Sequence, residues 1–360
     1  MLKNLDLVKN VEAAAGEALS SFLRELPFVT VVKLKSNGVL EGLADEFDLL
    51  AEIEVSGRQY KLICEVKSSG QPRHVRFGLL HLQNIRVHYR EDVIPVFIAP
   101  YLSPEAREMC RQYGVGYLDF EGNTFLQFEN IYIDRQTADT PRAEKRELKS
   151  IFRPKSAQIL KILLKCPERE WRVTELAEQA RVSVGHVSNV RTALLDREWA
   201  ELADGGFCLS DPNALLDEWR NSYGPPAGEP RTFYTTFHGR DFQEEILCLL
   251  KELRGHAAFA SFSAAQWLSA YARTGTHYFY ADEEGFEKLQ TSLKLGQVPK
   301  GHNVSITVVT DSGLLFDTEE PIEGAVCTSA IQTYLDLSIA GERGREAADY
   351  LRETKLNWSI

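Results

Sequence analysis

The stretch Glu46–Lys67, EFDLLAEIEVSGRQYKLICEVK, alternates apolar and polar residues on both sides of a turn. If Ser56–Gln59 form that turn, Val55 lies opposite Tyr60 in an antiparallel hairpin. A register shifted by one residue would set apolar side chains against polar ones, so the pattern fixes which residues share a face. The expected apolar face consists of Phe47, Leu49, Ala51, Ile53, Val55, Tyr60, Leu62, Cys64 and Val66.

The opposite face of the hairpin collects charge. Glu54 is expected opposite Lys61, and Asp48 opposite Lys67, with Glu65 one pleat away on the same face. Magnesium favours one or two carboxylates plus waters, so Asp48 and Glu65 are candidate metal ligands. Lys67 stays protonated beside two carboxylates, where its ammonium can orient water and stabilise a developing negative charge.

These residues resemble the motif of the PD-(D/E)xK nuclease superfamily. Asp48 matches its metal-binding aspartate and Glu65-Val66-Lys67 its E-x-K, while Glu12 matches an acid that many members carry on their first helix. Gln83 lies where some members place a Gln and a Tyr, although the Tyr here, Tyr89, comes six residues later. The resemblance implies a restriction-endonuclease-like fold and a Mg²⁺-dependent nuclease with catalytic Asp48, Glu65, Lys67 and Glu12.

Two other interpretations of this hairpin remain open. Polar faces of amphipathic hairpins often carry Glu and Lys, and an Asp48–Lys67 surface pair would contribute under ~1 kcal/mol. Alternatively, the same fold binds a partner protein or DNA and has no nuclease activity.

The length and the linkers predict a multidomain α/β protein. A chain of 360 residues exceeds one ordinary core, so two or three domains are expected. Residues 137–149 and the Pro- and Gly-rich residues 223–231 are the expected linkers. The predicted domains are a nuclease-like mixed sheet, a winged helix-turn-helix and a C-terminal α/β domain, at residues 1–136, 150–222 and 231–360.

The composition argues against two classes of protein, those that span a membrane and those that carry a signal peptide. No apolar run approaches the ~20 residues that span a bilayer, and Lys3, Asp6 and Lys9 interrupt the start where a signal peptide needs an apolar core. A cytoplasmic protein without a membrane segment is therefore expected, with six reduced cysteines, because no two are spaced as CxxC.

Charge is unevenly distributed along the chain. The net charge is −11, yet residues 142–165 hold eight Lys and Arg against two Glu. Residues 224–360 hold twelve basic and nineteen acidic residues. The basic segment, which includes Lys155, is expected to attract phosphates, while the C-terminal third repels them.

Residues 155–211 show a pattern of short helices followed by a hairpin. Thr174 and Ser183 are the expected N-caps of two helices, and Asp204-Gly205-Gly206 marks a turn between two short strands. This order is typical of a winged helix, whose third helix enters the major groove of DNA. That helix is expected to pack Val184, Val187, Val190 and Leu194 inward.

The outer face of the same helix holds the candidate DNA-binding residues. His186, Asn189, Thr192 and, at its edge, Ser188 are expected to face double-stranded DNA. Arg191 lies nearer the packed face and is expected to reach a phosphate. The alternative is a winged helix that mediates protein contacts.

The C-terminal third contains alternating strands and helices without a catalytic motif. Its segment SAIQTYLDLSIAGERGREAADYLR, residues 329–352, is similar to the C-terminal signature of AbiEi-like type IV antitoxins. The resemblance implies a transcriptional repressor that counteracts a nucleotidyltransferase-like toxin. A DNA-binding regulator is thus the leading hypothesis, and a magnesium-dependent endonuclease or a purely toxin-binding protein are the alternatives.

Overall fold

The computed structural model describes residues 2–39, 46–88, 93–137, 140–270, 274–311 and 313–358. The chain divides into two compact units. The first comprises residues 1–146 and 193–198, and the second residues 147–192 and 199–360. No helix in the described ranges is long and apolar enough to cross a membrane.

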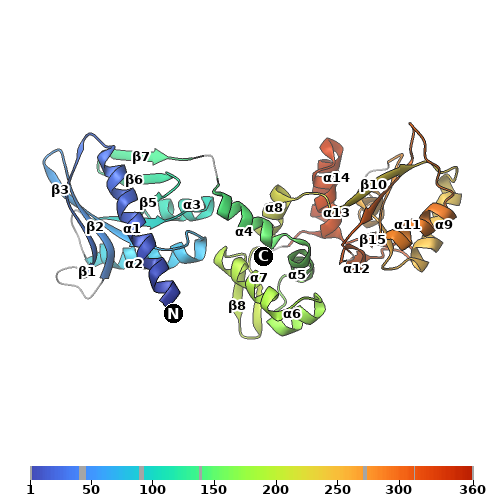
Figure 1. The fold of residues 1–360 in the computed structure, drawn as a ribbon, viewed down its shortest axis with the longest axis horizontal. Coiled ribbons are helices and arrows are strands. Elements are labelled where there is room, and N and C mark those ends of the chain that lie inside the picture. The colour runs from blue at the N-terminus through green and yellow to red at the C-terminus, as the bar shows by residue number, and fades with distance from the viewer. Residues whose placement is uncertain are drawn as a thin grey trace. The chain divides into compact units, whose positions relative to one another are not determined.

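The first unit contains a seven-stranded mixed sheet in chain order (Figure 1). Neighbouring strands are antiparallel except at the third, fourth and fifth, which run parallel. The elements are α1 (Leu2–Arg24), β1 (Val29–Val39), β2 (Glu46–Val55), β3 (Arg58–Val66), α2 (Pro72–His88), β4 (Val93–Ala99), α3 (Pro104–Gln112), β5 (Gly116–Asp119), β6 (Thr124–Phe128) and β7 (Ile131–Arg135).

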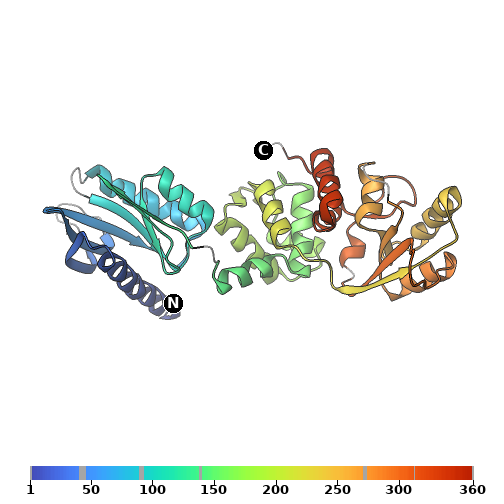
Figure 2. The same ribbon diagram turned by 90° about the horizontal axis from the view of Figure 1, so that it is seen from above.

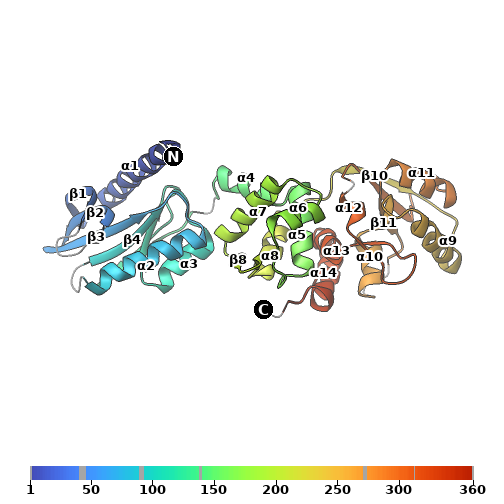
Figure 3. The same ribbon diagram turned by 90° about the horizontal axis from the view of Figure 1, so that it is seen from below.

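Helices cover both faces of this sheet, with α1 on one side and α2 and α3 on the other (Figure 2, Figure 3). Ala15 and Leu19 of α1 pack against the expected apolar face of the hairpin, including Leu49 and Cys64. The reverse face is also apolar, since Leu50 and Ile63 pack under α2. The sheet is therefore the centre of a three-layer α/β unit.

The predicted hairpin forms, but its register differs by two residues. Val55 lies opposite Arg58 rather than Tyr60, because the turn has only two residues, Ser56 and Gly57. Both have positive φ, at 51° and 80°, as a two-residue turn of the kind that fits the strand twist requires. A shift of two preserves the faces, so Glu54 meets Gln59 and not Lys61.

One side chain of the predicted apolar face lies elsewhere. Phe47 packs in the core under α2, with Leu50 and Ile63. A Cβ atom on Gly38, its partner on β1, would lie 2.6 Å from the Phe47 ring. The ring thus occupies space that only glycine leaves free.

Helices and a hairpin follow, most of their residues in the second unit. After α4 (Arg142–Ile151), which replaces most of the expected linker 137–149, come α5 (Pro154–Lys165), α6 (Val173–Gln179), α7 (Val184–Asp196), β8 (Ala200–Ala203), β9 (Gly206–Leu209) and α8 (Pro212–Ser222). Much of this segment is helical because RAEKRELK consists of strong helix formers, and the division between the two units, at Arg146 and Glu147, falls within it.

The predicted helix boundaries in this region are only partly right. Ser183 caps α7, since its Oγ accepts the N–H of His186 at 3.3 Å. Thr174 is not an N-cap: Arg172 precedes α6 and provides no side-chain cap. Val184 is 49% exposed rather than packed inward, because it is the first residue of α7.

The C-terminal part of this unit contains a six-stranded sheet in the order β10-β13-β12-β11-β15-β14. Its elements are β10 (Gly228–Phe233), α9 (Gly239–Glu252), β11 (Ala257–Phe259), α10 (Ser261–Leu268), β12 (His277–Ala281), α11 (Glu283–Ser292), β13 (Val304–Val309), α12 (Gly313–Phe316), β14 (Thr318–Glu319), β15 (Cys327–Thr328), α13 (Ala330–Ser338) and α14 (Gly341–Lys355).

Two glycines lie at the start of the last helix. Gly341 starts α14, and Gly344 lies in its first turn. A Cβ on Gly344 would lie 2.4 Å from the carbonyl oxygen of Leu337 and 2.8 Å from Cβ of Ala340. Gly344 therefore lets α14 pack closely against α13.

Candidate functional site

Glu65 is one of the buried charged residues of the first unit. It lies on β3, and its side chain is only 8% exposed. One carboxylate oxygen pairs with the ammonium of Lys67, and the other lies 2.7 Å from Nδ1 of His81 on α2. Two cationic or polar partners thus compensate a carboxylate that burial alone would strongly disfavour.

His81 is the site residue that the sequence did not predict. It lies above β3 because α2 approaches the sheet closely at Gly78. A Cβ on Gly78 would lie 2.4 Å from the Phe97 ring and 3.1 Å from Cγ of Glu65. The sequence contains one signal for this contact. Gly78 lies inside a helical pattern, and His81 follows three residues later on the same face of the helix.

Asp48 lies on β2 beside the end of β3. Its Oδ2 accepts the backbone N–H of Val66 at 2.6 Å, not a bond from Lys67 as the predicted register implied. Burial raises the pKa of Asp48, the Val66 hydrogen bond lowers it, and the charge of Glu65 raises it further. The charge of Lys67 lowers the pKa of Asp48, and that of Glu12 raises it.

The remaining residues of the nuclease-like motif lie at its margin. Glu12 on α1 is half-buried, and its Oε2 accepts a hydrogen bond from Nδ2 of Asn37 at 2.9 Å. Gln83 is half-buried on α2, two residues beyond His81. Tyr89 lies outside the described residues.

A divalent cation does not fit these residues as they are placed. Asp48 and Glu65 are suitable donor types, but both oxygens of Glu65 are engaged by Lys67 and His81. In the described ranges, no three His, Cys, Asp or Glu side chains gather to hold a metal ion. As they are placed, these residues therefore support no metal-dependent catalytic step.

The second candidate site is built on α7. Val187, Val190 and Leu194 are buried, as predicted. The hairpin β8–β9 is joined to the segment before α6 by two backbone bonds between Trp171 and Phe207, at 2.8 and 3.1 Å. The order is thus two helices, α5 and α6, then α7 and a hairpin that pairs with a short strand-like segment.

The outer face of α7 differs in part from the prediction. Asn189 and Thr192 are exposed, and Ser188 is half-buried. His186 is also half-buried, with Nε2 at 3.1 Å from Oγ of Ser156 on α5, so it does not point freely outward. Arg191 is half-buried and its Nε has no hydrogen-bond partner among the described residues.

Part of the basic segment 142–165 is not available to DNA phosphates. Lys161 is buried, and its Nζ lies 3.6 Å from Oδ2 of Asp317; Lys165 pairs with the other oxygen of Asp317. Lys155 is exposed at the start of α5. Arg172, which sequence reasoning missed, is exposed at the N-terminus of α6.

Comparison with known families gives one match. Residues 208–357 match the model of the family described as "Transcriptional regulator, AbiEi antitoxin, Type IV TA system". The match includes residues 329–352, so the predicted C-terminal resemblance is confirmed. No curated protein is significantly similar in sequence.

Three solved structures are weakly similar to part of the chain. A repair endonuclease from Pyrococcus abyssi has a TM-score of 0.22 at 14% identity, covering 29% of this chain and 46% of that one. EndoMS in apo form has a TM-score of 0.21 at 14% identity, covering 29% and 45%. The EndoMS–dsDNA2 complex has a TM-score of 0.21 at 18% identity, with the same coverage. The chain spans under half the length of these structures, and at such TM-scores the likeness carries no conclusion.

Proposed function

We propose that this protein is a DNA-binding transcriptional regulator of the AbiEi-like type, with α7 as its recognition helix in a winged helix. The observation that carries the proposal is the match of residues 208–357 to a family described as a transcriptional regulator. The helix order α5–α6–α7, followed by the β8–β9 hairpin, supports the same function because it is the order that winged helices use.

Different residues would position and read the DNA. Asn189 and Thr192, exposed on α7, are the candidates for contacts with base edges. Lys155 and Arg172, exposed at the N-termini of α5 and α6, are the candidates for phosphate contacts, which fix the orientation of a protein on DNA. His186 and Ser188 are assigned a supporting role, and Arg191 a phosphate contact that requires its side chain to extend.

A pair of variants tests these roles by fluorescence anisotropy on the DNA upstream of the gene. Asn189→Ala is expected to lower affinity for that DNA by about 1–3 kcal/mol and to leave affinity for scrambled DNA unchanged. Arg172→Ala is expected to lower the affinity for both DNAs equally. It should also reduce the slope of log affinity against log salt concentration by about 1. If Asn189→Ala lowers the affinity for both DNAs equally, α7 is not the helix that reads the base sequence.

The family description also supports a toxin as a protein partner. We propose a nucleotidyltransferase-like toxin, encoded nearby, as that partner. Co-purification of the tagged chain with the product of each adjacent gene tests this. A regulator that binds its DNA but captures neither neighbour would refute the toxin assignment while leaving the DNA assignment intact.

A DNA endonuclease is the second candidate function, and it requires Lys67 or His81 to release an oxygen of Glu65 so that a divalent cation can bind there. The observation that favours it is that Asp48 accepts the backbone N–H of Val66, between Glu65 and Lys67, which form an ion pair with each other. Incubation of plasmid DNA with Mg²⁺ or Mn²⁺ tests it. Cleavage that disappears in Lys67→Ala, while DNA binding persists, would establish the activity; cleavage that is unchanged in that variant would exclude this site.

A further inference from the structure

The second unit contains a cavity of about 320 Å³ beside α5. One face of this helix lines it, through Pro154, Ala157, Gln158 and Lys161, which recur at helical spacing. Trp219 and residues 222–227, at the end of α8 and in the segment before β10, also line it. We call this space the α5 cavity; its volume lies within the range of small-molecule sites.

The walls of the α5 cavity are aromatic and rigid. Phe152 and Trp219 both line it and stack on each other, with ring centroids 5.7 Å apart and planes inclined by 11°. Pro225 and Pro226 contribute further apolar surface without freely rotating side chains. Such a surface suits a planar ring, because stacking is favourable and little side-chain entropy is lost on binding.

One end of the α5 cavity offers hydrogen-bond donors. Lys161 is 3% exposed, and its Nζ has one partner in the described chain, Asp317 at 3.6 Å. An ammonium carries three donors, so this long contact leaves most of its capacity unused. The neighbouring Gln158, three residues earlier on the same helix, forms no hydrogen bond with a described residue.

The side chain of Gln158 lies against the start of α12. A Cβ on Gly313 would lie 1.9 Å from Nε2 of Gln158, so the amide packs directly on that glycine. Gln332 of α13 lines the same end, and its Nε2 donates to Tyr223 and to Asp336. Two amides and a buried ammonium therefore lie around one region of a largely apolar space.

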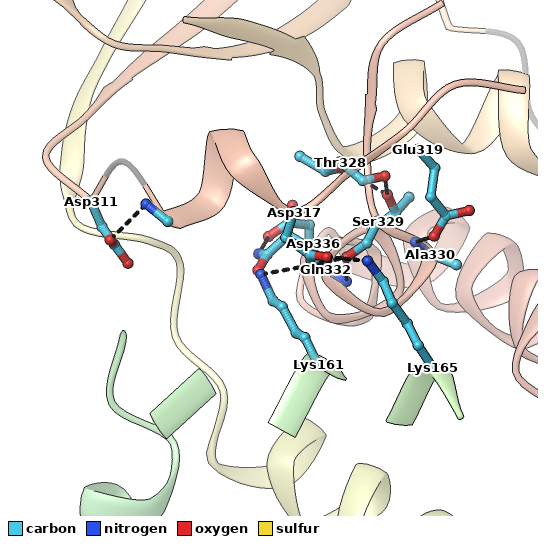
Figure 4. A network of polar contacts seen from close by, with 12 residues as sticks. Lys161, Lys165, Asp311, Asp317, Glu319, Thr328, Ser329, Ala330, Gln332 and Asp336 are labelled. Atoms are coloured by element: carbon cyan, nitrogen blue, oxygen red, sulfur yellow. Dashed lines mark hydrogen bonds and ion pairs between the residues drawn. The ribbon is translucent and has the colours of Figure 1, made fainter. Parts of the chain in front are cut away.

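The surrounding carboxylates determine the charge of a suitable ligand. Asp317 and Asp336 lie near the end of Lys161 (Figure 4), and Asp311 lines the α5 cavity. With three carboxylates around Lys161 and Lys165, an additional anion gains little from the ammonium and is repelled by Asp311. A ligand with neutral acceptor atoms uses the free donors without that repulsion.

We propose that the α5 cavity binds a small, uncharged aromatic ligand bearing hydrogen-bond acceptors such as an amide or ring carbonyl. Its ring lies against Phe152 and Trp219, and its acceptor meets Lys161 and Gln158. This site is independent of DNA recognition by α7.

Matched probe pairs test the charge and the ring together. Nicotinamide and indole-3-acetamide are titrated into the full chain beside nicotinate and indole-3-acetate, with binding followed by ligand-observed NMR. Each amide is expected to bind about tenfold more tightly than its acid, because Asp311 repels the carboxylate of the acid. Tighter binding of the acids would overturn the assignment to an uncharged ligand, and no binding by any of the four would overturn the site.

Variants then place the probe in the α5 cavity. Lys161→Met keeps the volume of the side chain and is expected to weaken nicotinamide about fivefold to tenfold, as loss of one hydrogen bond does. Ala157→Leu fills the cavity from the wall and is expected to abolish binding. Lys165→Met is the matched control, because Lys165 also pairs with Asp317 but does not line the cavity.

Folding is checked for each variant by its thermal transition. Should Lys161→Met fail to fold, Ala157→Leu alone decides the question, since it alters no charge. Binding unchanged in a folded Ala157→Leu protein, or weakened equally in Lys165→Met, would contradict the proposed location.

Discussion

Both units bury a charged side chain beside a helix, but they compensate it differently. In the first, Glu65 pairs with Lys67 and His81, whose side chains are 36% and 33% exposed. In the second, Lys161 is 4% exposed and its partner Asp317 only 15%. The compensating groups of Glu65 reach solvent, whereas those of Lys161 are themselves enclosed.

This difference decides what a mutation leaves behind. Removing Glu65 leaves two cationic or polar side chains that water can solvate. Removing Asp317 takes the ion-pair partner from the buried Lys161 ammonium, and breaking a buried pair in this way costs several kcal/mol. Substitutions in the enclosed pair of Lys161 and Asp317 are therefore expected to lower stability strongly. Substitutions at Glu65, whose partners reach solvent, are expected to lower it less.

The largest expected effect is at Asp317. Asp317→Asn should lower the free energy of unfolding by about 3–5 kcal/mol, because Lys161 loses its neutralising partner. Urea denaturation measures this change. The double variant Lys161→Met/Asp317→Asn should recover most of the loss; a double variant as unstable as Asp317→Asn would show that the ion pair is not the cause.

Asp336 should make stability depend on pH in an unusual direction. Burial raises its pKa from 3.8 to about 6, against the hydrogen bonds from Tyr223, Gln332 and Tyr280 and the charge of Lys161, which lower it. Between those two values the folded protein holds a proton that the unfolded chain releases. The contribution of Asp336 to the free energy of unfolding therefore falls as pH rises through this interval, by about 2–3 kcal/mol.

The pH effect is measured as the difference between the parent protein and Asp336→Asn. Urea denaturation of both from pH 4 to pH 7 removes the contribution of the other titrating groups. The parent should lose stability relative to the variant as pH rises. A difference that stays constant, or that changes in the opposite direction, would contradict the raised pKa.

The smallest effect is expected at Glu65. Glu65→Gln should cost about 1–2 kcal/mol, since a hydrogen bond to a charged group is lost while Lys67 and His81 remain accessible to water. The same denaturation assay applies. A loss as large as that of Asp317→Asn would remove the distinction between the two regions.

The sequence predicted strand faces better than contacts between elements. Except for Phe47, alternation identified which residues of β2 and β3 face α1, because a two-residue shift in register moves no side chain to the other face. It did not predict the register itself, which depends on the backbone conformation of Ser56 and Gly57. The ion pair of Asp48 with Lys67 was inferred from the wrong register.

Contacts that depend on helix rotation and close approach were not predictable from periodicity. His81 reaches Glu65 because Gly78 allows α2 to approach β3 and β4. Lys161 was counted as surface charge in a basic segment, yet its position on the inner face of α5 places it against Asp317. Both errors have one origin, since a single sequence does not show which residues of distant elements meet.

The most direct test of the proposed function is the salt-dependent preference of the purified chain for its own upstream DNA. Anisotropy titrations against that DNA and a scrambled duplex of equal length, from 50 to 200 mM salt, measure it. We expect the upstream DNA to bind about 10³-fold or more tightly than the scrambled duplex, with affinity for both falling as salt rises. Equal affinity for the two duplexes at every salt concentration would contradict a sequence-reading α7 and the regulator that it implies.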